Sequence, residues 1–222
     1  MKNRWIFIHG GWGGSWQWKP VIDKLEKNNI PFSAPDLPGM GEAEGSHITL
    51  SSFLDYTSAI IENSTGSINL VSFSFGGMTA TAMAERFHNR INKLIYIDAF
   101  VPDPGQSFTA IAGEKITRQI NSYADVMGEN NMIPPFIETD SRYRSHPLKT
   151  LFTDVHYNRE KLENLNPVYI ECMAKDPQWA FTPLLEETAA KIKSCNWTVH
   201  TLNSDHMPMY SHTEELYKIL MK

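Results

Sequence analysis

Six short runs of apolar, β-branched and aromatic residues, separated by segments with helical patterning, constrain the fold of this chain more than any other feature. The runs are Trp5 to Ile8, Ile30 to Ala34, Ile68 to Ser72, Leu94 to Ile97, Val168 to Cys172 and Trp197 to Leu202. Their hydrophobicity is continuous rather than alternating, which indicates strands covered on both faces. The sequence therefore predicts an α/β fold, with a mostly parallel sheet of about six strands and helices on both faces.

The segments between these runs predict the helices that cover the sheet, and one of them is much longer than the others. Helices are expected at Trp18 to Asn28, Leu50 to Glu62, Phe75 to Phe87 and Glu214 to Met221. Residues 101–164 are too long for an ordinary connection between two strands, and they are rich in proline, methionine, phenylalanine and tyrosine. We expect this insertion to form a small cap, with residues 1–100 and 165–222 forming the core.

Composition argues against several classes of function. The net charge is −5 and the basic residues are scattered, so nothing favours nucleic acid or an anionic membrane as a partner. No apolar stretch approaches the roughly 20 residues of a membrane helix, and the N-terminus lacks the pattern of a signal peptide. We expect a cytoplasmic monomer or homodimer. Cys172 and Cys195 form no Cys-x-x-Cys pair, so no structural zinc or other metal is expected.

A serine between small residues follows the third apolar run and precedes a predicted helix. This strand–serine–helix order is the layout of a nucleophile elbow, in which a strained turn exposes the serine hydroxyl. The turn requires small residues two positions before and after Ser74, and Ser72 and Gly76 meet this requirement. Two alternatives are a serine that caps a helix and a phosphate-binding loop. The second is disfavoured because no Gly-x-Gly-x-x-Gly spacing occurs here.

A glycine-dense loop, residues 9–14, follows the first apolar run. Loops at the carboxyl ends of parallel strands gather over the active site, and glycines let backbone N–H groups approach a substrate oxygen closely. Acyl transfer needs two such donors for its oxyanion. We predict that the N–H groups of Gly11 and Phe75 form this oxyanion hole, the alternative being a flexible glycine turn.

A histidine after the last apolar run completes the pattern of a hydrolase. His206 is placed to accept the Ser74 proton as general base and to return one to the leaving group. The acid that orients it should lie on the loop after the fifth run, where Asp176 is the first carboxylate. Asp98, at the end of the preceding strand, is the alternative, whereas Asp205 is poorly aimed because it adjoins His206. We predict Asp176.

Five motifs spread over the chain carry a resemblance to a known family. They run from His9 to Trp18, Ala34 to Gly41, Ser74 to Gly77, Tyr96 to Pro102 and Ser204 to Pro208. With them the chain resembles α/β hydrolases of the hydroxynitrile lyase and plant methylesterase type, a group that includes salicylate-binding proteins and bacterial members. The resemblance implies an α/β-hydrolase fold, a Ser-His-Asp triad, a reaction without cofactor, and a small helical cap over an apolar pocket. This chain departs from the group's pattern at Ser72, where the group has glycine, and in its acid loop.

The resemblance also separates two reactions. The lyases of this group resemble one another in having lysine directly after the catalytic histidine and threonine at the position of Gly11. This chain has Met207 after its histidine. We therefore predict a serine hydrolase that cleaves a small, largely apolar carboxylic ester, such as a methyl or aromatic ester, through an acyl-enzyme. A lyase and a non-catalytic binding protein remain the alternatives. The predicted pocket residues are Trp12, Met207, Phe108 and Met132, although the cap residues Phe108 and Met132 could instead pack the cap onto the sheet.

Overall fold

The centre of the molecule is a six-stranded sheet in the order β2-β1-β3-β4-β7-β8, in which every neighbouring pair is parallel. The computed structural model describes residues 3–40, 47–127, 131–135 and 140–222, so Gly41 of one sequence motif lies outside the described residues. The six strands are β1 (Arg4–Ile8), β2 (Phe32–Ser33), β3 (Ile68–Phe73), β4 (Ile91–Ile97), β7 (Val168–Cys172) and β8 (Thr198–Leu202). The prediction of a mostly parallel sheet of about six strands is confirmed.

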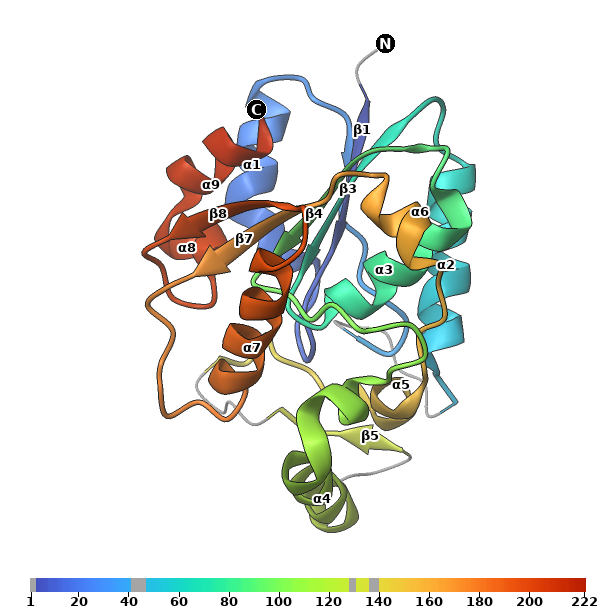
Figure 1. The fold of residues 1–222 in the computed structure, drawn as a ribbon, viewed down its shortest axis with the longest axis vertical. Coiled ribbons are helices and arrows are strands. Elements are labelled where there is room, and N and C mark those ends of the chain that lie inside the picture. Colours follow the sequence, from blue (N-terminus) through green and yellow to red (C-terminus); the bar gives the residue numbers. More distant parts are fainter. Residues whose placement is uncertain (1–2, 41–46, 128–130, 136–139) are drawn as a thin grey trace.

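Helices connect these strands and cover both faces of the sheet (Figure 1). They are η1 (Ser15–Trp18), α1 (Lys19–Lys27), α2 (Leu50–Glu62), α3 (Gly76–Phe87), α4 (Phe108–Met127), α5 (Leu148–Phe152), α6 (Arg159–Glu163), α7 (Thr182–Lys193), α8 (Pro208–Ser211) and α9 (Thr213–Leu220). The helix predicted at Leu50 to Glu62 has those bounds in the structure. Helix α7 was not predicted, although its buried Leu185, Ala189 and Ile192 follow the spacing of one helical face.

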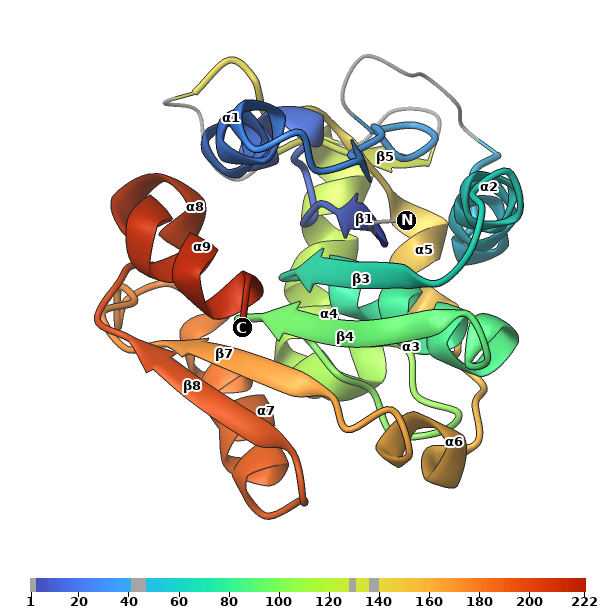
Figure 2. The same ribbon diagram turned by 90° about the horizontal axis from the view of Figure 1, so that it is seen from above.

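The sheet is buried on both faces, which explains why its strands are continuously apolar. Alternate residues of β1 point to opposite sides: Trp5 and Phe7 belong to one core cluster, and Ile6 and Ile8 belong to the other. Helices α1, α8 and α9 lie on the first side, and α2, α3 and α6 lie on the second (Figure 2). The chain passes from β1 outward to β2 and then returns to β3 on the other side of β1. In such open sheets, ligands bind at the carboxyl ends of the strands near this change of direction.

The long insertion divides into two parts. Helix α4, the antiparallel pair β5 (Met132–Ile133) and β6 (His146–Pro147), and α5 gather beyond one end of the sheet (Figure 1). Helix α4 bends at Gly113, whose φ of 76° is not helical. Helix α6 instead packs on the core, where Lys161 Nζ lies 2.6 Å from a carboxylate oxygen of Glu85 on α3. The residues beyond the sheet therefore end before α6, although the insertion extends to β7.

Candidate active site

Five loops meet at the carboxyl edge of the sheet and bring polar residues from distant parts of the chain together. The glycine-dense loop follows β1, Ser74 follows β3, and Asp98 follows β4. The loop after β7 contains Lys175, and the loop after β8 contains His206. Phe73 pairs with Ile97 in the register of β3 and β4, so Ser74 and Asp98 leave the sheet side by side. The strand order thus assembles one site from residues that are far apart in sequence.

Ser74 lies in the sharp, strained turn that the sequence predicts. Its φ is 52°, in the left-handed region that non-glycine residues rarely adopt. Two hydrogen bonds hold this turn against β4: the Ser74 N–H donates to Ile97 O at 3.2 Å, and the Phe100 N–H donates to Ser74 O at 3.0 Å. A Cβ on Gly76 would lie only 2.6 Å from the carbonyl oxygen of His9, so the turn requires glycine there. Ser72 is fully buried and fills the place of the usual glycine.

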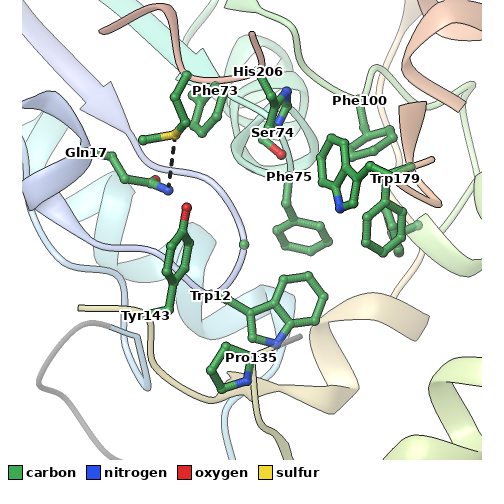
Figure 3. Close-up of a pocket in the computed structure, with 14 residues that line it drawn as sticks. Trp12, Gln17, Phe73, Ser74, Phe75, Phe100, Pro135, Tyr143, Trp179 and His206 are labelled. Carbon is green, nitrogen blue, oxygen red and sulfur yellow. Dashed lines mark hydrogen bonds between the residues drawn. The ribbon is translucent and has the colours of Figure 1, made fainter. Parts of the chain in front are cut away.

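His206 is held between an acid and two aromatic rings. Its Nδ1 donates to Oδ2 of Asp98 at 2.6 Å. The rings of Phe73 and Trp179 each lie with their centroids 4.6 Å from the imidazole centroid. With Nδ1 directed to the acid, Nε2 is the nitrogen left for other partners, and Figure 3 shows the Ser74 hydroxyl beside the His206 ring. This is the arrangement that a general base needs next to a serine nucleophile.

The acid beside His206 is Asp98, and the placement predicted for Asp176 is wrong. Asp176 is exposed, and its Oδ1 accepts the N–H of Gln178 at 2.8 Å within its own loop. The side chain that turns inward from this loop is the neighbouring Lys175, whose Nζ lies 3.0 Å from Oδ1 of Asp98. Asp205 points away as expected, since its Oδ1 accepts the Met207 N–H at 2.9 Å.

Two buried side chains support the glycine loop. Oε1 of Gln17 accepts the N–H of Gly10 at 2.9 Å, and a Cβ on Gly13 would lie 2.4 Å from the Gln17 amide group. On the other side, the Trp12 N–H points to Nδ1 of His146 at 3.5 Å. Sequence reasoning missed both supports, because a glutamine inside a short helical turn and a distant histidine carry no local signal for this role.

The two amides predicted for the oxyanion hole lie next to each other. A Cβ built on Gly11 would be 3.4 Å from the Cβ of Phe75, and both residues line the same pocket as Ser74. Within the described part of the chain, neither backbone N–H has a hydrogen-bond partner. Both N–H groups are therefore available to an oxygen atom beside Ser74.

Ser74 opens into an apolar pocket. Aromatic rings form most of its wall, and Figure 3 shows them around the serine. The lining residues are Gly11, Trp12, Gln17, Phe73, Ser74, Phe75, Phe100, Phe108, Pro135, Tyr143, Trp179, Phe181, His206 and Met207. Besides the serine and histidine, the lining carries the Tyr143 hydroxyl and the Gln17 amide, whose Nε2 donates to the Met207 sulfur at 4.0 Å. Such a pocket can take an uncharged apolar molecule.

Three of the four predicted pocket residues line this cavity: Trp12, Phe108 and Met207. Met132 does not; it lies on β5, next to the fully buried Ile133. Strand β5 reaches the pocket wall through the backbone of the next residue. The carbonyl of Ile133 accepts the indole N–H of the pocket residue Trp12 at 3.0 Å.

Charge around the pocket is low because its two neighbouring histidines are neutral. Burial lowers the pKa of His146 to about 3 and also lowers that of His9. Among the residues described, no three His, Cys, Asp or Glu side chains are grouped so that they could hold a metal ion. A search of the same residues finds no helix with the length and apolarity to cross a membrane.

Comparison with known proteins decides the family. The sequence model of the Alpha/beta hydrolase family matches residues 5–219. The chain belongs to this family. In this α/β hydrolase, Ser74, His206 and Asp98 follow β3, β8 and β4, respectively.

Relatives of this α/β hydrolase include named esterases. It is 29% identical to a carbendazim hydrolyzing esterase of Nocardioides sp. (strain SG-4G), over 55% of this chain and 52% of that protein. It is 24% identical to methyl jasmonate esterase 1 of Vitis vinifera, over 100% of this chain and 96% of that protein. The chain spans about half the length of some curated relatives that it matches, 52% of the Nocardioides esterase and 56% of an Arabidopsis thaliana chloroplastic protein.

The fold is also that of solved α/β hydrolases. An extracellular α/β-hydrolase from a Paenibacillus species, described as sharing structural and functional homology with tobacco salicylic acid binding protein 2, superposes with a TM-score of 0.82. The two share 19% sequence identity over 99% of this chain and 97% of the other. At this identity the likeness concerns the fold alone.

Proposed function

We propose that this chain is a carboxylic ester hydrolase in which Ser74 is the nucleophile, His206 the general base and Asp98 the acid that orients it. The observation that carries the proposal is the 2.6 Å hydrogen bond between His206 and Asp98, next to a serine held at a φ of 52°. The strained backbone of a pocket-facing serine costs free energy, and such strain is concentrated at active sites. The names of the esterase relatives support the same reaction.

The mechanism follows from the positions of these groups. His206 Nε2 takes the Ser74 proton while the serine oxygen attacks the ester carbonyl carbon, and Asp98 stabilises the imidazolium that forms. The N–H groups of Gly11 and Phe75 donate to the oxyanion. His206 then protonates the departing alcohol, which leaves an acyl group on Ser74. Water, deprotonated by His206, attacks this acyl-enzyme, and the carboxylic acid leaves with the serine proton restored.

The proposed substrate is a small, uncharged ester with an aromatic or aliphatic group. Its apolar part fits the aromatic wall of the pocket, and offset or edge-to-face ring contacts stabilise an aromatic group there. The hydroxyl of Tyr143 and the amide of Gln17 can bind one polar atom of the substrate. Charged acids or amines are disfavoured, because the pocket offers no opposite charge to compensate for their loss of water.

The proposal is tested by hydrolysis of p-nitrophenyl butyrate and methyl benzoate by the wild type and by Ser74→Ala. We expect the wild type to hydrolyse at least one of them and Ser74→Ala to lose at least about 10³-fold in kcat, since removing the nucleophile of a serine protease costs about 10⁶-fold. Equal rates in the two proteins contradict the proposal and favour a binding protein. Mandelonitrile separates the lyase alternative: apolar Met207 offers no charge to cyanide, so we expect no cyanide release.

We propose residues 101–164 as the cap over this site. Phe108, Pro135 and Tyr143 from this segment line the pocket, and Ile133 accepts the Trp12 indole N–H. These contacts all lie before α6, so the substrate-covering part is the segment up to α5. A cytoplasmic location and a monomeric or homodimeric state stay predictions, which cell fractionation and light scattering test.

A further inference from the structure

A lysine buried against the acid of the site has no role in the mechanism above. The side chain of Lys175 is 3% exposed and that of Asp98 is fully buried, with Nζ 3.0 Å from Oδ1. Nζ also donates to the carbonyl oxygen of Cys172. Lysine is among the residues least often buried, and an ion pair taken out of water gains little net stability because both charges lose hydration. Stability is therefore a weak reason for this pair.

The two oxygens of Asp98 have different partners. Among the described residues, Oδ1 accepts from Lys175 Nζ at 3.0 Å and from the Cys172 N–H at 3.3 Å, whereas Oδ2 accepts only from His206 Nδ1 at 2.6 Å. The backbone of Asp98 is fixed as well, since its N–H donates to Ile170 O at 2.7 Å. Lys175 thus holds one oxygen of the carboxylate and leaves the other directed at the histidine.

We propose that Lys175 is a positioning residue for ester hydrolysis, which holds Asp98 toward His206 and offsets part of the Asp98 charge. The inference rests on the proposed function. An unpaired carboxylate beside an imidazole favours the protonated imidazolium, which cannot accept the Ser74 proton. The Lys175 ammonium group lies 3.0 Å from Asp98 Oδ1, so its removal leaves the carboxylate charge unpaired and favours the imidazolium.

The other titratable groups near His206 are either neutral or directed away from the imidazole, so they do not replace the charge of Lys175. The charged or titratable groups on the packed elements are Asp98, Lys175, Asp205, Cys172 and Tyr169. Burial raises the pKa of the Cys172 thiol and the Tyr169 hydroxyl, so both are neutral at working pH. Asp205 is exposed and bonded to Ser211 Oγ at 2.9 Å, which directs it away from the imidazole. The rings of Phe73 and Trp179, whose centroids lie 4.6 Å from the imidazole centroid, carry no charge.

The test is the pH profile of kcat and KM for the better ester, in the wild type, Lys175→Met and Lys175→Arg. We expect Lys175→Met to move the acidic midpoint of kcat/KM upward by about one pH unit or more, the size of effect that a nearby charge has on an ionisable group. We also expect kcat to fall about tenfold or more at pH 6 with KM nearly unchanged, because the lysine does not touch the substrate pocket. Lys175→Arg should keep the midpoint close to that of the wild type.

Lys193→Met is the matched control. Lys193 also pairs with a buried carboxylate, since its Nζ lies 2.6 Å from Glu171 Oε2, but it lies on α7 outside the pocket. We expect it to leave the midpoint unchanged. If Lys175→Met does not fold by circular dichroism, Lys175→Gln replaces it, because glutamine keeps a donor for Asp98 without the charge, and the same upward shift is expected.

The outcomes separate the two proposals. No Ser74-dependent hydrolysis in the wild type overturns the proposed function itself. Ser74-dependent hydrolysis with an unchanged midpoint in the Lys175 variants overturns only the role of the lysine. A midpoint that moves equally in Lys193→Met also overturns it, because a general change in charge then explains the shift.

Discussion

At the scale of single residues, the proposed acid of this site depends on which side chain each loop turns inward. Asp98 is fully buried and bonded to His206, whereas Asp176 is exposed and bonded within its own loop. We expect Asp98→Asn to lower kcat by about 10⁴-fold, the effect of removing the orienting acid from a serine protease triad. Asp176→Asn should retain wild-type kcat. Steady-state hydrolysis of the same ester by both variants measures this.

A loss of catalysis in Asp98→Asn can be distinguished from a loss of folding. Asn can still accept from the Cys172 N–H, so near-wild-type circular dichroism is expected for Asp98→Asn. A mild loss in Asp98→Asn with a large loss in Asp176→Asn contradicts the assignment, because it requires the loop after β7 to refold around the histidine during catalysis.

At the scale of elements, the turn from β3 into α3 shows how packing overrides intrinsic propensity. Gly77 lies inside a buried helix, where propensity alone favours alanine by about 1 kcal/mol. A Cβ at this position would instead lie 2.2 Å from the carbonyl oxygen of Phe100. This neighbour is backbone and cannot rotate away. We expect Gly77→Ala to lower the free energy of unfolding by about 1–3 kcal/mol, the usual cost of overpacking, as measured by urea denaturation.

Gly11→Ala is the control for this prediction. Its Cβ would meet Phe75 Cβ at 3.4 Å, which is near ordinary contact, so we expect a smaller loss of stability than for Gly77→Ala. Equal or greater stability of Gly77→Ala than the wild type would mean that the strand and helix can move apart at the elbow.

The same elements show what the sequence predicts and where its information ends. Continuous apolar runs predict the strands, because both faces of the sheet are buried, and strand order then places Ser74 and His206 at one edge. The sequence left Asp98 only as the alternative to Asp176, because Lys175 and Asp176 are neighbours and only the contact with Asp98 decides which of them turns inward. Sequence spacing carries no information about a contact between residues 77 positions apart.

At the scale of the whole molecule, two buried histidines join the sheet, the glycine loop and the insertion. His9 donates from Nδ1 to Gly10 O at 2.9 Å and accepts the Leu37 N–H at Nε2, also at 2.9 Å. His146 Nε2 lies 2.6 Å from Thr150 Oγ1, and that hydroxyl donates to Pro147 O at 2.7 Å. The hydroxyl therefore accepts from Nε2–H, which leaves Nδ1 unprotonated. Each ring is held in one neutral tautomer by its partners.

These neutral histidines make the stability of the fold depend on pH. Burial lowers the pKa of His146 in the folded protein to about 3, against an ordinary value of 6.5 in the unfolded chain. Below pH 6.5 the unfolded chain therefore binds a proton that the folded protein excludes. The contribution of His146 is complete above pH 6.5 and is lost as the pH falls toward 3, with a slope of about 1.4 kcal/mol per pH unit. His9, whose pKa is also lowered, acts in the same direction.

We therefore expect the free energy of unfolding, measured by urea denaturation, to fall steeply between pH 6 and pH 4.5 in the wild type. His146→Gln keeps a donor for Thr150 but has no proton to gain, so its slope in this range should be smaller by about 1.4 kcal/mol per pH unit. His47→Gln is the control, because His47 is exposed and its loss should leave the slope unchanged. Carboxylates affect all three proteins alike, so only the difference between them reports on the histidine. Parallel curves for the wild type and His146→Gln would show that the folded protein accepts a proton at His146, and with it a charge beside the glycine loop.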